Sequence, residues 1–222
     1  MWKKVVFGLV ALMSAAHAEE LTCAVGGERF EVPDKGVCGE YAGDTMLLMP
    51  IGCPPGPMPQ CPQNFLPMYR AFTAEELPVL SQYMQSESYE SNVDFSPYYL
   101  AYIIEKHLKG PDRQLPVLLL LQGLWQTPAL ISDDPEYISA LAYELEATLN
   151  PETPDDNAMW LAMLGFTQFL GGNAEAAREL LERAESQASR SGPAQAYRAA
   201  VHACLANSSQ PHCTAMAAIP QP

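Results

Sequence analysis

The sequence predicts a mainly α-helical protein: an array of antiparallel helix hairpins with a small β-hairpin module, stapled by disulfides, at its N-terminal end. Three observations predict this fold. From about residue 73 the chain is rich in Ala, Leu and Glu at helical spacing. Residues 19–72 are instead rich in Pro, Gly and Cys, which favour short strands and loops. The chain has six cysteines, an even number, behind an N-terminus that resembles an export signal.

The first eighteen residues have the pattern of a secretory signal peptide. Lys3 and Lys4 precede an apolar run over residues 5–16, and Ala16-His17-Ala18 forms a small-residue cleavage site. The apolar run of about a dozen residues is shorter than the ~20 residues that a membrane-spanning helix needs. We therefore expect cleavage after Ala18, export to the bacterial periplasm or medium, and no membrane insertion of the processed chain.

The charge excludes two classes of partner. The 222 residues carry a formal net charge of −14, and 48% of them are hydrophobic, which is enough for a packed core. Binding of nucleic acid needs a basic face for the phosphates. Because this chain is strongly acidic, nucleic acid is not an expected partner. The same charge argues against docking to anionic lipid.

The β module is predicted from one glycine pair. Residues 21–25 and 28–32 are prone to form strands, and they flank Gly26-Gly27. Two glycines between such runs predict a hairpin turn, because both turn positions need a positive φ. Residues 45–49 are a further candidate strand, and residues 50–62, with six prolines, are expected to be an irregular loop.

The helical region begins at a capping box formed by Thr73 and Glu76. Ser96, followed by Pro97, and Asn173 are expected to cap later helices. The periodicity predicts helices over residues 98–109, 115–126, about 134–149, 155–170, 174–189 and 194–206. Short links between helices of this length favour antiparallel pairs stacked side by side. The expected segments are a signal peptide at 1–18, the β module at 19–72, the helical domain at 73–206 and a tail at 207–222.

One predicted helix pair resembles a tetratricopeptide repeat. A large residue is followed by Leu-Gly, and then by Ala, a large residue and Ala in the second helix, at the spacing of that repeat. Two features depart from it: the aromatic residue after the glycine is displaced to Phe169, and the closing proline comes late, at Pro193. An ordinary helical hairpin obeying the same packing rules stays an alternative. The residues that carry the resemblance are Leu161, Leu164, Gly165, Ala177, Leu181 and Ala184.

Two short stretches of the β module resemble zinc knuckles of the form C-P-x-C-G. The first begins at Cys23 and has Gly26 in place of the second cysteine; the second begins at Cys61 and has Asn64 there, followed by Phe65 in place of the glycine. Followed by helices, this order is similar to an uncharacterised bacterial family in which paired C-P-x-C-G knuckles precede a helical repeat region. The module thus resembles a degenerate zinc ribbon, and the resemblance implies an architecture without a reaction.

The cysteines of an exported chain are expected to form disulfides. Four cysteines of the module allow three pairings, and the resemblance implies Cys23 with Cys61 and Cys38 with Cys53, because the two half-knuckles then face each other. A retained four-cysteine zinc site is not expected, since neither knuckle keeps its pair of cysteines at two-residue spacing. Cys204 and Cys213 are expected to form a local clip that folds the tail over the last helices.

No motif predicts a catalytic residue, a cofactor or a metal site. The chain has no nucleophile elbow, zinc-binding helix, phosphate loop or dinucleotide fingerprint, and its acidic stretches precede helices, where they favour the helix dipole. Methionines around the Pro-rich loop could bind copper, but packing of the loop explains them without it. We expect structural or solvated roles for the histidines His107, His202 and His212, and packing roles for Met46, Met49, Met58 and Met68.

These observations favour a protein–protein interaction or scaffold module that binds a protein or peptide on its helical surface. Two alternatives stay open. One is an envelope enzyme whose active site the sequence does not reveal, and the other is a periplasmic metal-binding protein.

Overall fold

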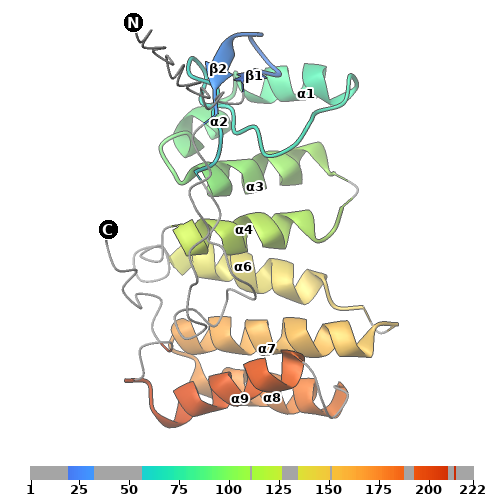
Figure 1. The fold of residues 1–222 in the computed structure, drawn as a ribbon, viewed down its shortest axis with the longest axis vertical. Coiled ribbons are helices and arrows are strands. Elements are labelled where there is room, and N and C mark those ends of the chain that lie inside the picture. The colour runs from blue at the N-terminus through green and yellow to red at the C-terminus, as the bar shows by residue number, and fades with distance from the viewer. Residues whose placement is uncertain are drawn as a thin grey trace, which may run out of the picture.

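A computed structural model describes residues 20–32, 57–110, 112–126, 135–150, 152–187, 193–209 and 213 of the chain. The described residues form a column of stacked helices with a two-stranded hairpin at one end (Figure 1). The protein is mainly helical, as predicted. The elements are β1 (Glu20–Thr22), β2 (Arg29–Glu31), α1 (Glu76–Tyr83), α2 (Glu87–Asn92), α3 (Pro97–Leu108), α4 (Leu115–Gln126), α6 (Pro135–Ala147), α7 (Pro154–Leu170), α8 (Ala174–Gln187) and α9 (Pro193–Ala206).

Several predictions fall outside the described residues. They are the signal peptide, the candidate strand at residues 45–49, the first part of the Pro-rich loop, most of the tail, and Cys38, Cys53, Met46, Met49 and His212.

The hairpin at the N-terminal end differs from its prediction. Strands β1 and β2 pair antiparallel with Leu21 opposite Phe30, but each has only three residues. The predicted two-residue glycine turn is wrong: the link is a six-residue loop from Cys23 to Glu28, closed where the Cys23 N–H donates to the Glu28 carbonyl at 2.8 Å. Gly26 and Gly27 do adopt positive φ, at 105° and 75°. The glycine pair therefore turns the chain inside a wider loop, whose first residue, Cys23, forms the disulfide with Cys61.

A second loop, from Cys61 to Leu66, faces the first. The Cys61 N–H donates to the Leu66 carbonyl at 2.9 Å, and the Phe65 N–H to the Cys61 carbonyl at 2.9 Å. Phe65 takes the left-handed conformation, with φ of 59°, that the knuckle motif reserves for glycine. A disulfide joins Cys23 to Cys61, with their Cα atoms 5.6 Å apart. The two loops are thus held face to face by a covalent bond.

The helices stack so that successive ones pack against each other: α3 on α4, α4 on α6, and α6 on α7 (Figure 1). One apolar cluster fills this column, and a second joins the hairpin end to α1, α2 and α3. The composition change near residue 72 is therefore not a packing boundary. The second cluster is formed by Cys23, Cys61, Leu66, Leu80, Tyr83, Tyr89, Leu100 and Ile104.

Two of the three predicted helix caps form. The Thr73 N–H donates to Glu76 Oε2 at 2.8 Å and the Glu76 N–H to Thr73 Oγ1 at 3.3 Å, which completes the capping box. Asn173 Oδ1 accepts from the Ala176 N–H at 3.3 Å. The prediction for Ser96 is wrong in one respect: Pro97 does begin α3, but the Ser96 hydroxyl makes no cap hydrogen bond and is buried without a partner from the described residues.

The repeat-like residues line the seam between α7 and α8. All six lie in these two helices, and the five that carry side chains are buried. A Cβ added to Gly165 would lie 3.2 Å from the Ala177 carbonyl oxygen, so glycine permits the close approach of the two helices. Helix α9 packs on both, and the disulfide Cys204–Cys213, with Cα atoms 5.2 Å apart, ties the tail to α9. None of the described helices is both long enough and apolar enough to cross a bilayer.

Lys109 ends α3 in the left-handed conformation, with φ of 53° and ψ of 46°. This conformation costs a residue with a Cβ about 1 kcal/mol relative to glycine. We expect Lys109→Gly to be about 1 kcal/mol more stable than Lys109→Ala, which removes the same charge but keeps the Cβ. Urea unfolding of both variants measures the difference, and equal stabilities would contradict the conformational argument.

Candidate functional site

The residues predicted from the sequence form the frame of the molecule and do not converge on one site. The disulfides lie at opposite ends of the column, and the repeat-like residues are buried in the α7–α8 seam. His107 stacks on Tyr83 with ring centroids 4.2 Å apart, and His202 is exposed on α9. Met58 is buried in the core of the column and Met68 is half-buried beside the disulfide cluster, in keeping with packing roles.

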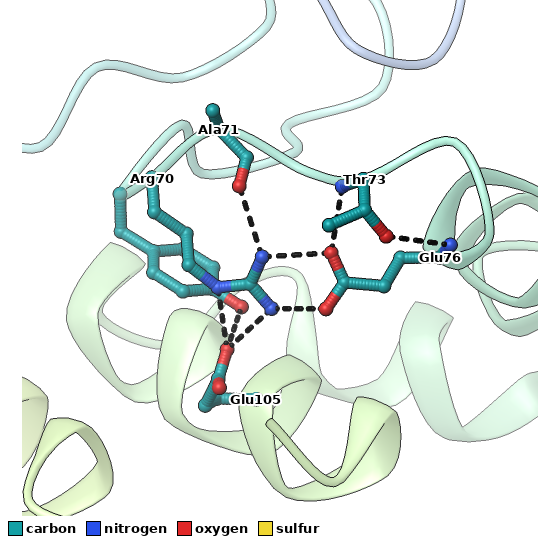
Figure 2. A network of polar contacts seen from close by, with 6 residues as sticks. Arg70, Ala71, Thr73, Glu76 and Glu105 are labelled. Carbon is teal, nitrogen blue, oxygen red and sulfur yellow. Dashed lines mark hydrogen bonds and ion pairs between the residues drawn. The ribbon is translucent and has the colours of Figure 1, made fainter. Parts of the chain in front are cut away.

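A polar network that the sequence did not reveal centres on Arg70, in the segment that leads into α1 (Figure 2). The guanidinium binds Glu76 through two parallel hydrogen bonds, Nη1 to Oε2 at 2.9 Å and Nη2 to Oε1 at 2.7 Å. It binds Glu105 of α3 through Nε and Nη2, both 2.9 Å from Oε2. Nη1 also donates to the Ala71 carbonyl at 2.9 Å. Arg70 therefore donates four hydrogen bonds, and its Nη2 also forms an ion pair with Glu105.

Two carboxylates share this one guanidinium. Hydrogen bonds from Arg70, and then from the Thr73 backbone, lower the pKa of Glu76 to about 2. Tyr69 donates its hydroxyl to the same oxygen of Glu105 at 2.8 Å, and its pKa is raised, chiefly by burial and next by that bond. Glu105 is only 2% exposed, so the network holds this carboxylate against the Arg70 guanidinium within the stack.

The other oxygen of Glu105 has no hydrogen-bond donor among the described residues. Figure 2 shows it without a dashed line and directed away from Arg70. It lies against Gly110, where any side chain would collide with it. Glu105 and Gly110 both line an open hollow of about 400 Å³ at the ends of α3 and α6 and the start of α4.

The hollow is lined by charges of both signs. Glu144 of α6 is 3% exposed, accepts a hydrogen bond from Tyr102 at 3.1 Å and pairs with Lys106 at 2.9 Å. Lys109 and Arg113 are exposed at the rim, and neither is ion-paired with another described residue. The described lining residues are Glu105, Lys106, Lys109, Gly110, Asp112, Arg113, Pro116, Glu144 and Ala147.

This arrangement is suited to binding. The described lining contains no histidine and no hydroxyl or thiol nucleophile, and both buried carboxylates are held by a cation and a tyrosine. Tyr143 extends the surface beside the hollow: it is 64% exposed, and Lys106 Nζ lies 5.5 Å from its ring centroid. The hollow offers charged groups, and the exposed Tyr143 ring lies next to one of them, Lys106; together they can hold a polar ligand or chain segment.

Sequence reasoning missed this site, although a signal was present. Glu105 follows Ala101 by four residues and Glu144 follows Leu141 by three, so each carboxylate stands on the buried face of its helix. A carboxylate on an apolar face needs a partner, and only the folded chain shows that the partners are Arg70 and Lys106.

One further group of side chains could hold a metal ion. Among the described residues, Cys23, Glu28 and Cys61 are the one group of three or more potential ligands that lie close enough together.

Comparison with known proteins gives no match: no family model fits the chain, and no curated protein or solved structure is significantly similar to it. The resemblance to the paired-knuckle family therefore stays a prediction.

The first prediction from this site concerns Arg70. Arg70→Met leaves the Glu105 carboxylate buried without its cation, so we expect a loss of about 3–5 kcal/mol in the free energy of unfolding. Adding Glu105→Leu should restore part of it, because the buried charge is then gone. Arg29→Met is the control: its ion pair with Glu20 is exposed and 3.8 Å long, and its loss should cost less than about 1 kcal/mol. Equal losses for Arg70 and Arg29 would contradict this role.

The second prediction concerns pH. The pKa of Glu76 falls from an ordinary value of 4.5 to about 2 in the folded chain. A lowered pKa adds stability that is present above the unfolded value and is lost as pH falls towards the folded value. We expect the free energy of unfolding to fall between pH 4.5 and pH 2, and to fall less in Glu76→Gln. The exposed neighbour variant Glu75→Gln should behave like the parent chain, and an unchanged pH profile in Glu76→Gln would contradict the assignment.

Proposed function

We propose that the chain is an exported interaction module that binds a protein or peptide partner on its stack of helices, in the periplasm or outside the cell. The hollow at the ends of α3, α4 and α6 supports this proposal most directly. It combines exposed cations, buried carboxylates and an exposed tyrosine on rigid helix ends, and rigid elements place binding groups more reliably than loops do.

The compartment is argued from the cysteines and the leader. Residues 1–18 have the pattern of a signal peptide, and the structure contains disulfides, which persist in oxidising compartments. A mainly helical chain with two described disulfides is compatible with a location outside the cytoplasm.

The architecture supports a scaffold role. In this proposal the α7–α8 hairpin is a tetratricopeptide-like repeat, and α9 with its disulfide-tied tail covers the end of the array. Stacked helix pairs that bury a shared core leave extended surfaces for partners, and a terminal unit needs such a cover.

A photo-crosslinking amino acid at position 143 tests the proposal in the full exported chain. We expect it to capture a specific partner in the periplasm, identified by mass spectrometry, because Tyr143 borders the hollow. The same probe at Glu179, exposed on α8, is the matched control and should not capture that partner.

Charge reversal at the rim sharpens the test. Lys109→Glu with Arg113→Glu should abolish the adduct at position 143 while leaving the fold intact, since both side chains are exposed. An adduct that survives this change, or one formed equally from position 179, would refute the assignment of the hollow.

A further inference from the structure

The Glu28 carboxylate lies against the Cys23–Cys61 disulfide and has no neutralising partner among the described residues. A Glu28 oxygen and the two sulfurs lie within 4.8 Å of one another. Both Glu28 oxygens are buried, and neither accepts a hydrogen bond from a described residue. The adjacent Arg29 pairs instead with Glu20, at 3.8 Å. Burying a carboxylate in this way costs free energy unless a cation compensates for it.

We propose that Cys23, Cys61 and Glu28 form a redox-controlled site for a divalent metal ion of the zinc type. In the disulfide form the two sulfurs are bonded to each other and cannot act as thiolate ligands. After reduction, two thiolates and one carboxylate form a ligand set that Zn²⁺ accepts, with Zn–S distances of about 2.3 Å and Zn–O distances of about 2.0–2.2 Å. The ion also neutralises the carboxylate, which in the oxidised form has no hydrogen-bond partner among the described residues.

Among the described residues the site has three protein ligands, which leaves a fourth position for a ligand from outside this set. Asn64 is nearby, but its Nδ2 donates to the Val25 carbonyl at 2.8 Å and its Oδ1 accepts from the Leu66 N–H at 3.1 Å. Its amide is therefore occupied in holding the two loops together. Tetrahedral zinc with three protein ligands keeps its fourth position for water or an external ligand.

The space for the carboxylate depends on Gly26. A Cβ at this position would collide with the Glu28 carboxylate, and the φ of 105° is one that side chains rarely adopt. Gly26, which the sequence predicts to serve a hairpin turn, thus makes room for a side chain beside the sulfurs.

The redox step needs a dithiol reductant of the thioredoxin class. Two electrons and two protons pass from the reductant to Cys23–Cys61: the S–S bond breaks, two thiols form, and the reductant becomes a disulfide. The metal ion then displaces both thiol protons into solvent and forms two metal–sulfur bonds and one metal–oxygen bond. Cys23 is 3% exposed and Cys61 fully buried, so the loops must separate before a thiolate can attack.

Cobalt titration of the full processed chain tests the site, because Co²⁺ bound by thiolate gives sulfur-to-metal absorption bands that report its ligands. The chain is reduced with a phosphine, desalted without oxygen, and compared with the oxidised chain. We expect these bands in the reduced chain, their absence in the oxidised chain, and displacement of Co²⁺ by Zn²⁺. Equal binding by both forms, or a reduced chain without the bands, would overturn the proposal.

Substitutions separate this site from the other cysteines. Cys23→Ser should remove the bands, and Glu28→Gln should weaken Co²⁺ binding at least tenfold while circular dichroism shows the helices intact. Glu31→Gln, which changes an exposed carboxylate on β2, should bind as the parent chain does. If the absorption bands survive Cys23→Ser, or if Glu28→Gln leaves the Co²⁺ affinity unchanged, the metal is bound by other residues and the proposal is wrong. None of these results depends on whether the hollow binds a partner.

Discussion

The arrangement of the N-terminal module, α1 and α3 depends on the contacts of the Arg70 guanidinium. Arg70 stands in the segment between the disulfide-linked loops and α1, and its nitrogens bind the first turn of α1, the buried face of α3 and the neighbouring Ala71 carbonyl. A buried carboxylate that loses its cation costs several kcal/mol. The N-terminal module is therefore fixed to the column by charge as well as by the apolar cluster that it shares with α1, α2 and α3.

The same network shapes the candidate binding surface. Glu105 gives one oxygen to Arg70 and Tyr69, and its other oxygen lies against Gly110 at the wall of the hollow. The links from α3 to α4 and from α6 to α7 lie on one side of the column (Figure 1), which brings the ends of these helices together. Helix α3 therefore joins the disulfide-linked module to the surface that we propose binds a partner.

Predictions from the sequence were confirmed where the interacting groups are close together in the chain. The Thr73–Glu76 capping box and the Asn173 cap formed because both partners lie within one helical turn. The prediction failed where distant residues compete. The predicted two-residue turn did not form: the loop runs from Cys23 to Glu28, and its first residue is bonded to a cysteine 38 residues away. Ser96 takes the cap position, but burial isolates its hydroxyl.

The sequence by itself determined the class of fold, the six helices from α3 to α9 and the glycine that lets α7 and α8 approach, because periodicity and caps act over a few residues; it did not predict α1 and α2 as separate helices. Only the tertiary structure decided the functional geometry. Arg70 and Glu105 are 35 residues apart, Lys106 and Glu144 meet across two helices, and Glu28 lies beside a sulfur from another loop. No local rule brings such groups together, since their pairing depends on which faces of the elements pack and on where each buried charge finds its partner.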